Sequence, residues 1–238
     1  MSQTTPAVVD LNPQGNAKAD RGGWFERTLV CPEWTSLPGR ISFVYCLVSL
    51  AIFAGLWASG DHGAFGVVVE LGIWVPLSLL VARFLRQPLG PATYLLAVIF
   101  LALVEESIAF YTGGGLHGTA TSLPQDWVRA VPTFLGIAVG MMLSVRWLGL
   151  TAPESFATAA LAGIVIELGL GDGFNPLALI ALAGGVAWLY GTILALPLKH
   201  ATPPSAPWAR GLGTVAVVGA CALAGGFLGL FLQLALGL

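Results

Sequence analysis

Residues 91–112 read PATYLLAVIFLALVEESIAFYT, an apolar stretch with two adjacent glutamates near its end. A helix needs about 20 mainly apolar residues to cross the hydrocarbon core of a bilayer, so this stretch is long enough to span one. Other stretches of the chain share this character, although 154–170 is short and contains Glu167. The seven predicted spans are 41–59, 64–83, 91–112, 130–150, 154–170, 176–198 and 211–238.

The composition excludes an ordinary soluble domain. The 238 residues are 56% hydrophobic and only 9% charged, whereas a soluble domain carries about 25% charged residues. So few charges could not cover a water-facing surface without large apolar patches. The net charge is −2 and no basic run occurs, so nucleic acid is not expected as a partner.

The basic residues predict the orientation, because cytoplasmic loops carry an excess of Lys and Arg. With the N-terminus inside, only Arg129 of the ten Lys and Arg residues falls outside. A missed or additional helix would move the later loops to the other side and spoil this division. We therefore expect an all-α, polytopic integral membrane helix bundle of about seven transmembrane helices in the plasma (inner) membrane, N-terminus in and C-terminus out. The inside residues are Lys18, Arg21, Arg27, Arg40, Arg83, Arg86, Arg146, Lys199 and Arg210.

The predicted organisation is a cytoplasmic tail over 1–40 and a transmembrane bundle over 41–238. The tail has few large apolar residues up to about residue 22, which is typical of disorder. Residues 24–37 mix Trp with charged residues and fit a segment lying at the inner membrane surface, where Trp is favoured; an irregular tail is the alternative. Two GxxxG pairs, Gly136–Gly140 and Gly225–Gly229, predict close helix contacts.

Acidic residues are the main candidates for a functional site. Four glutamates lie within the predicted spans: Glu70, Glu105, Glu106 and Glu167. An ionisable residue at the centre of a bilayer costs at least about 2.5 kcal/mol and normally faces the protein interior or water. The face between Glu105 and Glu106 carries the small residues Ala102 and Ala109, which suit helix contact. We expect the four glutamates to share the outer third of the bundle, and at least two to meet.

Arg129 is the predicted partner of this acidic layer. It is the only cation on the outer side, and it is expected at the start of the fourth span, after a long loop over 113–129. An ion pair with Asp126 or Glu106 would satisfy it. The loop could also fold back over the glutamates as a lid, although a simple connector is as good an explanation.

Metal and cofactor sites have weak signals. His62, His117 and Asp61 lie in predicted outer loops and are weak metal-ligand candidates, because no two of them have a recognisable ligand spacing. No His lies within a predicted span, which argues against haem or chlorophyll ligated by an intramembrane His.

The Glu105–Glu106 pair resembles the start of the first motif of the CAAX-type intramembrane glutamate proteases, Glu-Glu-x-x-x-Arg. Here Phe110 stands at the position of the Arg. The later Phe-x-x-x-His and His-x-x-x-Asn motifs of that family have no counterpart, so the resemblance covers two residues.

Three functions remain open at this stage. A transporter could bind a proton, a cation or a cationic solute at the glutamates. A structural or assembly subunit could pair them with cations of other membrane subunits or of a second copy in a homo-oligomer. An intramembrane enzyme could use Glu105 and Glu106 as general acid and base. In all three the lipid bilayer is a partner.

Overall fold

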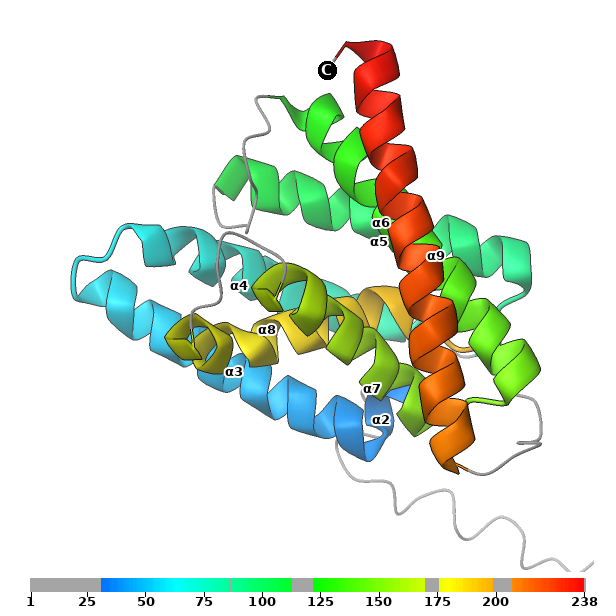
Figure 1. Cartoon of the computed structure of the whole chain (residues 1–238). Coiled ribbons are helices and arrows are strands. Elements are labelled where there is room, and N and C mark those ends of the chain that lie inside the picture. The colour runs from blue at the N-terminus through cyan, green and yellow to red at the C-terminus, as the bar shows by residue number, and fades with distance from the viewer. Residues whose placement is uncertain (1–30, 86, 113–121, 170–175, 199–206, 238) are drawn as a thin grey trace, which may run out of the picture.

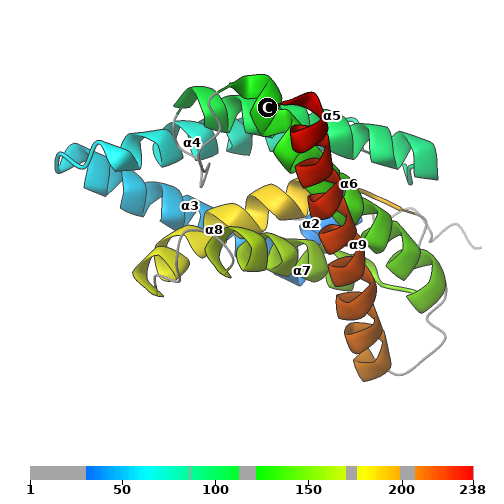
Figure 2. The same ribbon diagram turned by 45° about the horizontal axis from the view of Figure 1, so that its top comes forward.

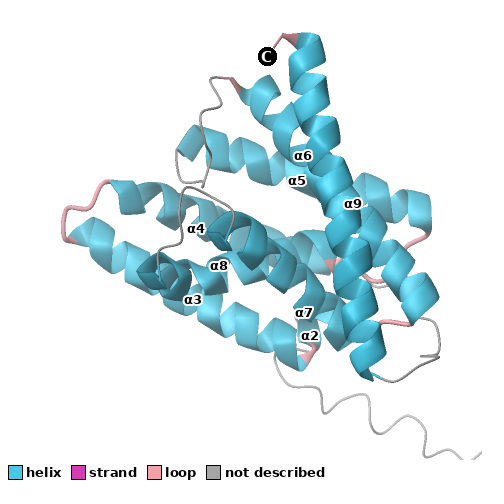
Figure 3. Cartoon of the chain, in the orientation of Figure 1, coloured by secondary structure: helices cyan, strands magenta, loops and turns pink. Residues whose placement is uncertain are grey.

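The computed structural model describes residues 31–85, 87–112, 122–169, 176–198 and 207–237. These residues form helices, shown in Figures 1 and 3, and one isolated bridge between Leu89 and Leu198. In chain order the elements are α2 (Pro32–Thr35), α3 (Leu37–Ala58), α4 (Gly63–Ala82), α5 (Pro91–Thr112), α6 (Leu123–Leu143), η3 (Ser144–Leu148), α7 (Ala152–Gly163), η4 (Ile164–Gly169), α8 (Pro176–Leu194) and α9 (Pro207–Leu236).

Five helical segments are long and apolar enough to cross a membrane. They are Leu37–Ala58, Gly63–Ala82, Pro91–Thr112, Leu123–Leu148 and Arg210–Leu236. A shorter apolar helix covers Ile180–Leu194. The all-helical class and the presence of several membrane-spanning helices therefore agree with the sequence.

Local chemistry sets where the helices end. Between α3 and α4, Gly60 takes φ +101°, a left-handed conformation that L side chains rarely adopt. Asp61 Oδ1 then accepts the Gly63 N–H at 2.9 Å at the start of α4. At the start of α7, the Thr151 and Glu154 side chains form a reciprocal capping box.

Two stretches depart from α-helical geometry. η3 and η4 are π-helices that continue α6 and α7 respectively. Such wide turns are rare and are found frequently at functional sites. η3 ends at Gly149, which has a left-handed φ of 69°, and η4 carries Glu167.

α9 packs along α6 and crosses the remaining helices, as the two views in Figures 1 and 2 show. The backbones approach closely at glycines: a Cβ added to Gly136 would collide with the carbonyl oxygen of Cys221, and one added to Gly225 with that of Pro132. The close contact predicted from the GxxxG pairs is confirmed.

α8 lies against α3 and α7 and carries the centre of the core. Its Trp188 is fully buried and meets the edges or faces of Phe43 and Trp34, with ring centroids 4.9 and 6.0 Å away. The Trp188 indole donates a hydrogen bond to Ser78 Oγ at 3.1 Å. The centre of the core is therefore aromatic, and the indole N–H of Trp188 finds its acceptor inside the bundle.

The C-terminus of α8 receives hydrogen bonds from two aromatic side chains. The last carbonyls of a helix have no partner within the helix. Here Tyr94 donates its hydroxyl to Leu194 O at 2.8 Å, and Trp34 donates its indole N–H to Ala195 O at 3.0 Å. α2 is thus anchored to the end of α8.

Contacts between distant segments gather helix ends on one side of the bundle. Leu89 N donates to Pro197 O at 2.7 Å, and Arg210 Nη2 donates to Glu154 Oε1 at 3.0 Å. These bonds join the starts of α5 and α9 to the end of α8 and the start of α7. We call this side the basic end, after the arginines Arg40, Arg83, Arg146 and Arg210.

Several boundaries differ from those expected. α6 begins at Leu123, so part of the predicted 113–129 loop is helical, and Arg129 lies inside α6 and not at its start. The polar residues of its first two turns lowered the local hydropathy and concealed this beginning. α3 begins at Leu37, and α9 begins at Pro207.

The part of the tail that the structure describes is also different. Trp34 was expected at the membrane surface, but α2 buries it completely beside Trp188. Its indole N–H finds a protein acceptor there, which offsets the cost of burial. Residues 1–30, including the predicted disordered segment, lie outside the described residues.

Candidate functional site

Five carboxyl groups from four elements converge inside the bundle. Glu70 of α4, Glu105 and Glu106 of α5, Asp126 of α6 and Glu167 of η4 lie close enough to interact electrostatically. We call these residues the carboxylate cluster. The four predicted glutamates are thus brought together, and Asp126 joins them.

Packing of α5 against α6 buries much of this cluster. Glu105, Glu106 and Asp126 have only 6%, 4% and 2% of their surface exposed. Ala102 and Ala109 are fully buried on the same side of α5, in agreement with the contact face expected from the sequence. Small side chains at these positions let the neighbouring helices approach the two glutamates.

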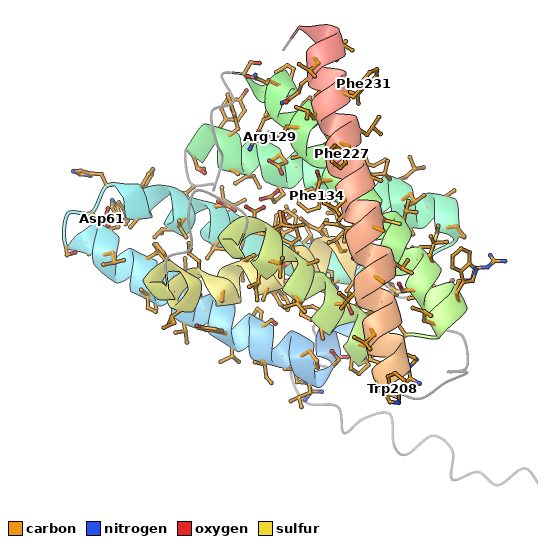
Figure 4. The ribbon with its side chains drawn as sticks, in the orientation of Figure 1. Asp61, Arg129, Phe134, Trp208, Phe227 and Phe231 are labelled. Carbon is orange, nitrogen blue, oxygen red and sulfur yellow. The ribbon has the colours of Figure 1, made fainter. Side chains whose placement is uncertain are left out.

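Tyr190 of α8 supports the cluster from another side. Its hydroxyl donates a hydrogen bond to Glu167 Oε1. Its ring is stacked on Phe134, with centroids 4.9 Å apart and planes 22° apart, and it lies against Gly163, where a Cβ would collide with the ring. Figure 4 shows Phe134 in the middle of the bundle. Three contacts therefore fix the donor that faces Glu167.

The charges around Glu105 are of one sign. The groups that act on it are the carboxyls of the other four members of the cluster. Glu105 Oε2 is buried and has no hydrogen-bond partner among the described residues. A buried polar atom in this state is unusual and costs free energy.

Glu106 and Asp126 share a side-chain hydrogen bond. Two carboxyl groups can form such a bond only when a proton lies between them. The cluster therefore has the chemistry to hold a proton.

Arg129 does not join the cluster. It lies three residues after Asp126 on α6, its side chain is exposed, and it forms no ion pair with a described residue. The expected pairing with Asp126 or Glu106 is therefore absent from this part of the chain. The Arg129 backbone instead contacts α9, where a Cβ at Gly229 would lie 2.9 Å from its carbonyl oxygen.

The weak metal candidates stay apart from the cluster. Asp61, labelled in Figure 4, and His62 lie at the exposed α3–α4 turn, where Asp61 receives the Gly63 N–H. His117 lies outside the described residues. Within the described ranges, no group of three or more His, Cys, Asp or Glu side chains could hold a metal ion.

Sequence reasoning missed three residues of the site: Asp126, Tyr190 and Phe134. Asp126 was placed in a loop, but it follows the helix-starting pair Leu123-Pro124, which is a recognised N-terminal signal. Tyr190 and Phe134 had no signal, because aromatic residues in apolar helices usually only fill the core.

The helices and the buried carboxyl groups define the class of the chain as a multi-pass helical membrane protein. Comparison with models of protein families, with curated proteins and with solved structures gives no match. The two-residue resemblance to the CAAX-type glutamate proteases therefore supports no family assignment.

Proposed function

We propose that this chain is a transporter that takes up a proton or another cation through the carboxylate cluster. The observation that carries the proposal is the convergence of five carboxyl groups from α4, α5, α6 and η4, with the buried Glu105 Oε2 left without a described hydrogen-bond partner. Like charges packed in a poorly solvated site must be neutralised. A proton or cation can neutralise these charges and leave again, whereas an arginine of the chain would neutralise them permanently.

In this proposal the chain crosses the membrane seven times, with its N-terminus in the cytoplasm. The contacts at the basic end support the count, because they join the start of α5 to the segment after α8, and the start of α9 to the start of α7, as alternating passes require. The positive-inside rule then assigns the basic end to the cytoplasm. The carboxylate cluster lies toward the outside, in the plasma (inner) membrane.

The burial of the cluster favours transport over assembly with other subunits. Glu105, Glu106 and Asp126 are almost fully enclosed, so a cationic side chain of a partner would have to enter the bundle to reach them. A proton or a small cation needs a much narrower path.

The test is flux into liposomes that contain the purified protein and a trapped pH-sensitive dye. We expect the lumen to become acidic when acid is added to the external buffer. Glu105→Gln should abolish this response, because it removes the unpartnered carboxylate. Replacing sodium and potassium by choline in parallel distinguishes proton flux from cation flux. Glu154→Gln at the basic end is the matched control and should retain flux. Normal flux in Glu105→Gln liposomes would overturn the proposal.

A further inference from the structure

A second feature, unrelated to the carboxylate cluster, lies at the basic end. A cavity of about 540 Å³ opens between the start of α5, the end of α6 with η3, and the segment after α8. Cavities of about 300–1,000 Å³ are typical of small-molecule sites. Its lining is apolar apart from Arg146, and includes Leu89, Leu143, Trp147 and Leu198.

One wall of the cavity is built from non-helical backbone. Leu89 and Leu198 form a parallel bridge, and the Leu89 N–H bonds to Pro197 O at 2.7 Å. At membrane depth, irregular backbone is tolerated only where it is buried in protein or lines a cavity. The bridge and its hydrogen bond hold the two segments side by side, so this wall is a defined surface.

Arg146 is the charged group at this cavity. Its side chain is exposed, and it forms no ion pair with a described residue. Arg210 at the same end is different, because it is paired with Glu154 at 3.0 Å. Trp147 follows Arg146 on η3 and is 62% exposed, as is typical of a Trp at a membrane interface.

We propose that this cavity binds one anionic phospholipid, with an acyl chain against Leu143 and Leu198 and the headgroup phosphate at Arg146. Charge complementarity selects this occupant: an apolar cavity ends at an arginine without a described acidic partner, beside an interfacial Trp. Arginine matches phosphate in charge and geometry. The site does not depend on the carboxylate cluster or on transport.

The test is native mass spectrometry of the full chain, released from detergent with phosphatidylglycerol or phosphatidylcholine. One phosphatidylglycerol should be retained about fivefold more than phosphatidylcholine, the ratio that about 1 kcal/mol per basic residue at an anionic surface produces. Arg146→Gln should remove this preference. Arg129→Gln, which changes another exposed arginine of the same helical segment, should keep it.

A preference that survives in Arg146→Gln, or one that the wild-type chain lacks, would overturn the site. So would non-saturating retention of many phosphatidylglycerol molecules, which indicates bulk annular lipid. Inorganic phosphate should fail to displace the lipid, and displacement would reassign the site to a soluble anion.

A second variant tests the cavity itself. Leu143→Trp should narrow the cavity where the acyl chain lies and lower the retention of phosphatidylglycerol several-fold, while circular dichroism reports an unchanged helical fold. Undiminished retention in this variant would place the lipid elsewhere and contradict the proposal.

Discussion

Two regions that α8 contacts have opposite kinds of polar surroundings. At its C-terminus, Trp34 and Tyr94 donate hydrogen bonds to the terminal carbonyls at 3.0 and 2.8 Å. Toward the carboxylate cluster, Tyr190 provides one hydroxyl for Glu167, while Glu105 Oε2 has no partner among the described residues. At the end of α8 two terminal carbonyls receive donors, whereas the carboxylate cluster gathers acceptors.

This difference separates a stabilising region from a functional one. Fully satisfied polar groups in a low-dielectric interior make a core rigid and specific. Buried polar groups that lack hydrogen-bond partners lower stability, and they are usually retained because a function requires them. The comparison predicts that substitutions at the basic end destabilise the fold, and that some in the cluster stabilise it.

The largest effect is expected from Trp34→Ala. The change removes a fully buried indole and its bond to Ala195 O, so the free energy of unfolding should fall by about 3–5 kcal/mol. Trp147→Ala is the control, because Trp147 is 62% exposed at the same end. Thermal unfolding in detergent measures both. Equal shifts in melting temperature would contradict the anchoring role of α2.

A smaller effect with opposite signs is expected from two carboxyl-to-amide changes. Glu105→Gln should raise the free energy of unfolding by about 1 kcal/mol, because it removes a carboxylate from among like charges. Glu154→Gln should lower it by about 0.5 kcal/mol, because the capping box and the partly exposed ion pair with Arg210 are weakened. Denaturant titration in mixed micelles distinguishes them. A loss of stability in both variants would remove the contrast between the two regions.

The smallest effect concerns Cys31, beside α2. Burial, then the charge and hydrogen bond of Glu33, raise the pKa of its thiol well above the usual value. The unfolded thiol loses its proton near pH 8.5 while the folded one keeps it, so stability is complete below that pH and is lost as pH rises. By pH 8.5 the free energy of unfolding should have dropped by about 0.4 kcal/mol.

Cys31→Ser provides the control for this pH dependence. Since a hydroxyl does not titrate in this range, the decline between pH 8 and pH 9 should be flatter in that variant. A decline as steep as that of the wild-type chain would assign the pH effect to another group.

The sequence was sufficient for the features that depend on single segments. Length and apolarity predicted the helical membrane class, and the GxxxG pair at Gly225 predicted close packing, now seen against Pro132. The meeting of the glutamates also followed, because a carboxylate inside a span must face the protein interior. Each of these features depends on residues within one helix, so it is visible in the local sequence.

The remaining features depend on partners that are distant in the chain. Trp34 suits a membrane surface as well as a core, and its distant partners Trp188 and Ala195 place it in the core. Asp126 has the composition of a loop residue until α5 and α6 pack together. A π-helix has no distinct hydropathy, so the turn that carries Glu167 could not be foreseen.

That π-turn makes the position of Glu167 sensitive to chain length as well as to residue identity. A π-helix places more residues in a turn than an α-helix, because its bonds run from i to i+5. Deleting one codon between Gly163 and Glu167 would allow a regular α-helix and rotate Glu167 by about 100° around its axis. All five carboxylates would remain in the gene product, yet one would no longer point toward the other four. In this segment, a one-residue deletion would therefore disturb the site more than most substitutions would.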